Sequence, residues 1–214
     1  YTTAFCAAGG LLAYLNITQR QALPHLSTIT LEKNDDYLAL DAATQSHLAL
    51  FENQRGTDEH TLFSTLDHTA SPMGSRLLKR WLGRPLRCHT RLNMRQKSIA
   101  ELLQKQELDL IHQALKKTRD LERIASRIAL KSARPRDLVQ LRDTLAVLPE
   151  LHPLLFERYQ AEPLTELSNA LAPQPELFSM LSNALVDNPP MLIRDGGVIA
   201  PGFDNLLDEY RGLS

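Results

Sequence analysis

The segment from Leu66 to Leu86, LDHTASPMGSRLLKRWLGRPL, constrains the fold most, because it contains the start, the end and both faces of one helix. Ser71 is a residue type that caps helix N-termini, and Pro72 follows it at the first helical position, where proline is favoured. Gly83 and Pro85 are typical of a helix end. The segment therefore predicts a helix that begins at Pro72 and stops near Gly83.

The two sides of this helix differ in chemistry. At the helical spacing of roughly 100° per residue, one side gathers the apolar residues Met73, Leu77, Leu78, Trp81 and Leu82. Gly74 falls among them, and we expect it to let a neighbouring helix come close. The opposite side carries Arg76, Lys79 and Arg80. We expect a core face built around Trp81, with a basic back that is either a solvated surface or a contact for phosphate or an acidic domain.

A second basic helix is expected from Arg119 to Lys131. Its apolar stripe consists of Leu121, Ile124, Ala125 and Ile128. Arg119, Arg123 and Arg127 follow one another at intervals of four residues on the far side, where like charges repel. Asp120 and Glu122 offset only part of that charge. Either acidic groups elsewhere in the same protein or a nucleic-acid backbone neutralises the rest.

The remaining chain is also mostly helical in pattern. A helix is expected from Thr90 to Leu103, and another begins at Pro135, with Leu138, Leu141, Leu145 and Leu148 spaced as a packed seam. From Pro149 onward prolines are frequent, so the helices there should be short or bent. Residues 27–40 are the exception, because β-branched alternation around a turn at Asn34-Asp35 predicts a small β-hairpin. Asp41 and Asp204 are expected to cap the helices that follow them.

Composition fits a globular protein with an uneven charge distribution. The 214 residues carry a net charge of −1, but residues 71–136 hold 17 Lys and Arg against five Asp and Glu, a net charge of +12. The rest holds seven against 20, a net charge of −13. Such a basic block points weakly to nucleic acid or to an acidic neighbour. No apolar run reaches the length of a membrane span, and two cysteines, Cys6 and Cys88, suit a reducing cytosol.

No constellation in the sequence supports catalysis. The seven histidines show no metal-binding spacing, and neither cysteine joins them at such a spacing. Asp67-His68 lacks a nucleophile on a sharp turn, and neither glycine pair lies in a phosphate-binding loop. We therefore assign no catalytic, nucleotide-binding or metal-binding residue, and no cofactor, to this chain.

Four stretches together resemble the MutS family of DNA mismatch-repair proteins, and its bacterial members most closely. They are LDAATQSHLALFENQRG (residues 40–56), TLFSTLDHTASPMGSRLLKRWLGRPL (61–86), RDLERIASRIALKSARPRDLVQLRDTL (119–145) and RDGGVIAPGFDNLLDEYR (194–211). They occur in the order found in the family. The departures are mild: His47-Leu48-Ala49 stands where Asn-Leu-Glu is usual, and Phe203 where Tyr is common.

The resemblance implies which part of such a protein this is. The family reads mismatches with an N-terminal Phe-x-Glu motif and hydrolyses ATP with a C-terminal Walker A loop, and this sequence contains neither motif. We therefore expect an internal fragment, a mostly α-helical core and lever bundle with long helices. Its expected parts are the end of a connector (1–20), the helical core and lever domain (21–190) and the transition into the DNA-holding clamp (191–214).

The resemblance also implies a function. The fragment should transmit changes between the DNA clamp and the ATPase domain without being an enzyme itself. The complete protein should bind mismatched double-stranded DNA, ATP and Mg²⁺, pair with a second copy and with MutL, and lie in the bacterial cytoplasm at the nucleoid, not in a membrane. The alternative is a module in which the basic block 71–136 binds DNA directly and without sequence preference.

These expectations single out ten residues. Four are expected to be structural: Pro72, Gly74, Trp81 and Pro135. Six are expected to contact phosphate or another domain, with an interdomain role favoured for most of them: Arg76, Lys79, Arg80, Arg119, Arg123 and Arg127.

Overall fold

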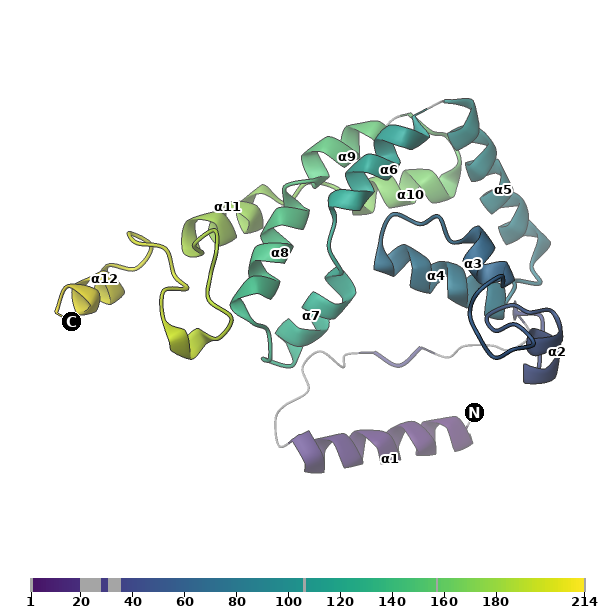
Figure 1. Cartoon of the computed structure of the whole chain (residues 1–214), viewed down its shortest axis with the longest axis horizontal. Coiled ribbons are helices and arrows are strands. Elements are labelled where there is room, and N and C mark those ends of the chain that lie inside the picture. The colour runs from purple at the N-terminus through teal and green to yellow at the C-terminus, as the bar shows by residue number, and fades with distance from the viewer. Residues whose placement is uncertain (1, 20–27, 31–35, 106, 157, 214) are drawn as a thin grey trace. The chain divides into compact units, whose positions relative to one another are not determined.

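Helices make up most of the chain in a computed structural model that describes residues 2–19, 28–30, 36–105, 107–156 and 158–213. The chain divides into two units, Tyr1–Glu32 and Lys33–Ser214. Figure 1 labels the α-helices, whose bounds are α1 Thr2–Gln19, α2 Ala42–His47, α3 Leu62–Leu66, α4 Pro72–Gly83, α5 His89–Gln104, α6 Leu108–Lys117, α7 Leu121–Ala129, α8 Pro135–Leu145, α9 Leu148–Leu155, α10 Glu162–Ala170, α11 Pro175–Ala184 and α12 Asn205–Gly212. A 3₁₀ turn, η2 Ile193–Asp195, lies between α11 and α12.

The first unit contains α1, whose apolar residues are spread around the helix axis and do not form one stripe. Phe5, Leu11, Tyr14 and Ile17 are all exposed. Within the part of the chain that the structure describes, no helix is long and apolar enough to cross a membrane.

The helix starts that depend on capping residues are confirmed in the second unit. The Ser71 hydroxyl accepts the Gly74 N–H at 3.2 Å with Pro72 in the first turn of α4, and Asp41 accepts the Thr44 N–H at 2.7 Å. Asp204 caps α12 by accepting the Leu207 N–H at 2.9 Å. These side chains satisfy amide groups that have no partner within the helix. Helix boundaries encoded by caps could therefore be predicted from the sequence.

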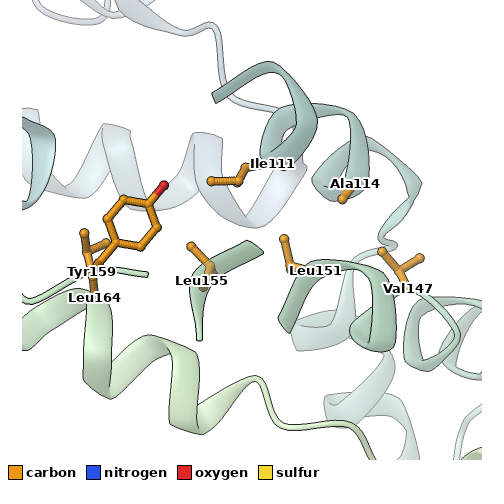
Figure 2. Packing of buried hydrophobic residues seen from close by; sticks show 7 residues of the cluster. All are labelled: Ile111, Ala114, Val147, Leu151, Leu155, Tyr159 and Leu164. Carbon is orange, nitrogen blue, oxygen red and sulfur yellow. The ribbon is translucent and has the colours of Figure 1, made fainter. Parts of the chain in front are cut away.

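Two apolar clusters hold the helices of this unit together. The first joins α6, α9 and α10 through Ile111, Ala114, Val147, Leu151, Leu155, Tyr159 and Leu164, which Figure 2 shows. The second joins α8 to α11 through the buried Leu145, Leu181 and Leu185. Leu138, Leu141 and Leu148 pack against it, so the predicted seam is confirmed.

A carboxylate also joins two helices that are distant in the sequence. Glu101 of α5 accepts the backbone N–H groups of Gln160 at 2.9 Å and Ala161 at 3.2 Å, where α10 begins. A negative charge is favourable there, because the first N–H groups of a helix are unpaired and point outward. Short helices α9, α10 and α11 confirm the expectation for the proline-rich part, and Pro153 lies inside α9.

The described residues of the expected hairpin are not paired with each other. Residues 28–30 form no strand, and the expected turn at 34–35 lies outside the described residues. Tyr37 instead forms an antiparallel bridge with Leu86, where the Leu38 N–H donates to the Pro85 carbonyl at 2.7 Å. The alternation therefore reflects pairing with the segment after α4, which lies almost 50 residues further along the chain and could not be inferred from a local pattern.

Candidate functional site

The start of α4 is fixed by the segment that precedes it. The Asp67 carboxylate accepts the hydroxyl protons of Ser75 at 2.5 Å and Thr69 at 2.6 Å, and the Thr69 N–H at 3.2 Å. These hydrogen bonds, with that of Ser75 the most important, lower the pKa of Asp67. The segment 67–71 is thereby attached to the first turns of α4, which sets where the basic side of that helix points.

Arg76 connects α4 to the start of α7. Its guanidinium donates to both carboxylate oxygens of Asp120, at 2.7 and 2.8 Å, and its Nε donates to Glu122 at 3.0 Å. Asp120 is also the N-cap of α7 and accepts the Arg123 N–H at 3.3 Å. The Arg76 hydrogen bond lowers the pKa of Asp120, and Asp120 followed by Glu122 raises the pKa of Arg76.

Arg127 continues this series of ion pairs from α7 to α8. Its guanidinium lies 2.6 Å from the carboxylate of Asp137, which is buried. The second Asp137 oxygen accepts the Arg134 N–H at 2.9 Å, so the same carboxylate closes the start of α8, where Pro135 occupies the first turn as predicted. A carboxylate that receives both bonds is held more firmly than one in a single surface pair.

The other expected contact residues are placed differently. The Lys79 ammonium lies 5.3 Å from the ring centre of Phe51 and 5.8 Å from that of Phe63. Arg80, Arg119 and Arg123 are exposed. Arg119 precedes α7, and its backbone N–H donates to Thr144 Oγ1 at 3.0 Å. The expected stack of three arginines along one helix is therefore wrong at its first member, because the helix begins only after the Asp120 cap.

The expectation of a core centred on Trp81 is also wrong. Within α4, all of whose residues are described, none is buried, and Trp81 is 41% exposed. The Arg95 guanidinium of α5 lies 3.7 Å from the indole ring centre and occupies the place of an apolar neighbour. The spacing of apolar residues identified correctly which side of α4 faces the core. It carries no information on how closely the neighbouring helices approach that side.

Gly74 has a different role from the one expected. A methyl group added there would lie 3.2 Å from Cβ of Thr69, in the segment that leads into α4, and 3.5 Å from the Ser71 hydroxyl. The close approach is therefore made by the preceding turn and not by a neighbouring helix. The glycine permits the compact arrangement in which Asp67 reaches back to Ser75.

A cavity of about 530 Å³ lies between α4 and the first apolar cluster. Its walls include Leu77 of α4, Leu102 of α5, Ile111 of α6, Leu151 of α9 and Leu167 of α10. Arg76, Arg80 and Glu122 also line it. The apolar side of α4 thus faces the core across a space, while Arg76 holds the helix to α7.

These features define a helical structural module in which ion pairs join α4, α7 and α8. The described residues contain no cluster of His, Cys, Asp and Glu that could hold a metal ion. The sequence matches the family description MutS domain III over residues 43–210. The chain therefore belongs to the MutS family and contains a domain of a DNA mismatch-repair protein.

Sequence reasoning missed the partners of these cations. The stretch RDLERIASR did contain Asp120 and Glu122, but their partner Arg76 lies 44 and 46 residues earlier. The one available signal was the excess of like charge on the two basic helices, which required acidic groups from elsewhere. It indicated that partners exist without identifying them.

Proposed function

We propose that this chain is the structural and coupling portion of a bacterial DNA mismatch-repair ATPase, and that it links the DNA clamp to the ATPase domain. The complete protein would bind mismatched duplex DNA and ATP with Mg²⁺, and would act with a second copy and with MutL in the cytoplasm. The observation that supports this proposal is the Arg76 contact with Asp120 and Glu122, which joins two helices from distant parts of the sequence.

A coupling element needs connections that change between discrete arrangements. The ion pairs Arg76–Asp120 and Arg127–Asp137 join α4, α7 and α8 in series. The cavity beside α4 leaves room for that helix to move relative to the core. A shift of α4 would therefore be passed to α7 through Arg76, and from α7 to α8 through Arg127.

The test uses a full-length protein that contains this domain. Arg76→Ala should reduce the effect of mismatched DNA on ATP hydrolysis and the effect of ATP on release of that DNA. Lys117→Ala is the matched control, because it also removes a cation from an interhelix pair, with Glu150 at 2.7 Å. A charge exchange, Arg76→Asp with Asp120→Arg, should restore part of the coupling. Unchanged coupling in a folded Arg76→Ala protein would contradict the proposal.

The isolated chain provides a second check on its role. We expect no ATP hydrolysis by the pure 214-residue chain, because the proposed function assigns hydrolysis to another domain. Stoichiometric turnover that follows the chain through purification would overturn this assignment.

Direct DNA binding is the alternative function, and the exposed side chains of Arg80, Arg119 and Arg123 favour it. Non-specific binding would then have a dissociation constant of roughly 10⁻⁴ to 10⁻⁶ M and would weaken steeply with salt. A titration of the chain with duplex DNA from low to high salt tests it. A salt slope near zero would exclude phosphate contacts by these arginines.

A further inference from the structure

The stretch of sequence that forms α4 and most of α5 is basic and contains no acidic residue. From Ser71 to Ala100 the sequence contains no Asp or Glu but eight Lys and Arg: Arg76, Lys79, Arg80, Arg84, Arg87, Arg91, Arg95 and Lys97. Arg76 is paired with Asp120 and Glu122. Among the residues that the structure describes, Arg80, Arg87, Arg91 and Lys97 have no ion-pair partner. Such a concentration of unpaired charge is unfavourable unless an acidic group approaches it.

Apolar and aromatic groups lie within the same surface. Trp81 of α4 is 41% exposed, and Ile99 and Leu103, one turn apart on α5, are 54% and 61% exposed. The stacking of Arg95 on Trp81 joins the two helices. Burial, followed by repulsion from Arg91, lowers the pKa of Arg95, so a nearby carboxylate would relieve that repulsion. We call the surface made of Trp81 and of the residues that follow one another at intervals of four along α5, Arg91, Arg95, Ile99 and Leu103, the Trp81 face.

We propose that the Trp81 face is a docking site for an acidic protein segment that also carries apolar side chains. Carboxylates of the segment would pair with Arg91 and Arg95, while its apolar side chains would cover Trp81, Ile99 and Leu103. This proposal does not depend on the coupling function, because it concerns Trp81 and one side of α5 and none of the ion pairs to α7.

The chemistry of the face favours protein over nucleic acid. Protein interfaces are enriched in tryptophan and arginine at their energetically important positions, whereas nucleic-acid interfaces are more polar and use cations over a polar surface. A phosphate backbone would leave Ile99 and Leu103 without an apolar partner. It would also find one side of the indole ring already covered by Arg95.

The test exploits the fact that Trp81 is the sole tryptophan of the chain. The first probe is a synthetic helical peptide with Glu and Leu on adjacent faces, and the second replaces each Leu with Gln. A 20-base-pair duplex is the third probe. Fluorescence of Trp81 and anisotropy of a labelled peptide give two independent readouts. The Glu–Leu peptide should bind about 10-fold more tightly than the Glu–Gln peptide, because only the former covers apolar surface.

Charge-reversed variants locate the binding. Arg91→Glu should weaken binding of the Glu–Leu peptide by about 10-fold, since like charges then meet. Arg55→Glu makes the same change in net charge on an exposed residue outside the face, and should alter binding less than about 2-fold. Circular dichroism confirms that both variants fold.

Three outcomes would overturn the proposal. One is failure of the Glu–Leu peptide to bind, or binding that both charge-reversed variants reduce equally. Another is tighter binding of the duplex than of the peptide, with loss in Arg91→Glu, which would make this a nucleic-acid surface. The last is concentration-dependent self-association in sedimentation that the same variant abolishes, which would assign the face to a second copy of the chain.

Discussion

Truncation of Leu151 to alanine tests whether the first apolar cluster carries the stability of the second unit. Leu151 lies on α9 and is 1% exposed, in contact with a cluster contributed by α6 and α10. The change removes the equivalent of three buried methylene groups, which costs about 2.4 kcal/mol in transfer free energy alone, at about 0.8 kcal/mol for each group. Incomplete collapse of the space left behind adds to that, so the free energy of unfolding should fall by about 3 kcal/mol.

Leu167→Ala is the matched control. Leu167 of α10 lines the same cavity as Leu151 but is 55% exposed. Little of its surface leaves water on folding, so the same change in side chain should cost less than about 1 kcal/mol.

Urea unfolding followed by circular dichroism measures both variants. A loss of about 3 kcal/mol corresponds to a fall in Tm of roughly 6–12 °C for a unit of this size. Equal losses at the two positions, or a loss below about 1 kcal/mol at Leu151, would refute the reasoning, since the exposed fractions would then not report which leucine carries stability.

Three further predictions concern α4, α7 and α12. Arg76 lowers the pKa of Asp120 in the folded state. The stability advantage of the wild type over Asp120→Asn should therefore be complete above the ordinary carboxylate pKa of about 3.9, and should be lost as the pH falls through the lower pKa of the folded state. Urea midpoints from pH 7 to 2 measure this advantage, and a constant difference would contradict the prediction. Gly74→Ala should lower the free energy of unfolding by up to about 1 kcal/mol despite the better helix propensity of alanine. The added methyl group would press on Thr69, which its hydrogen bond to Asp67 keeps from moving away. An increase in stability on urea unfolding would disprove the close contact. Amides of residues 206–212 should exchange rapidly with deuterium, because α12 has no buried residue and is short; strong protection would show that it is packed.

The parts of the fold that depend on neighbours in sequence could be predicted, because the responsible groups are within a few residues of each other. Ser71, Asp41 and Asp204 each cap a helix three residues before the amide they bind. The seam on α8 needed only the spacing of its leucines. The family could be inferred from long stretches of sequence and is confirmed over residues 43–210.

The parts that depend on distant residues could not be predicted. Spacing placed Trp81 on the apolar side of α4, but whether that side is covered depends on α5, which presents Arg95. Tyr37 pairs with Leu86, which follows α4. A local alternation of apolar and polar residues predicts an extended segment, but it does not identify the segment with which it pairs. The roles of all six cations as phosphate or interdomain contacts stay predictions: Arg76, Lys79, Arg80, Arg119, Arg123 and Arg127.

The carboxylate of Glu101 at the start of α10 has a consequence for the order in which the helices assemble. It lies 59 residues from the Gln160 amide, so the bond closes a long loop and cannot form until the ends of that loop meet. The loop between them contains α6 and α9, whose own contacts with each other span a shorter stretch of chain. Since contacts across shorter separations form faster, we expect α6 and α9 to meet before α10 joins α5.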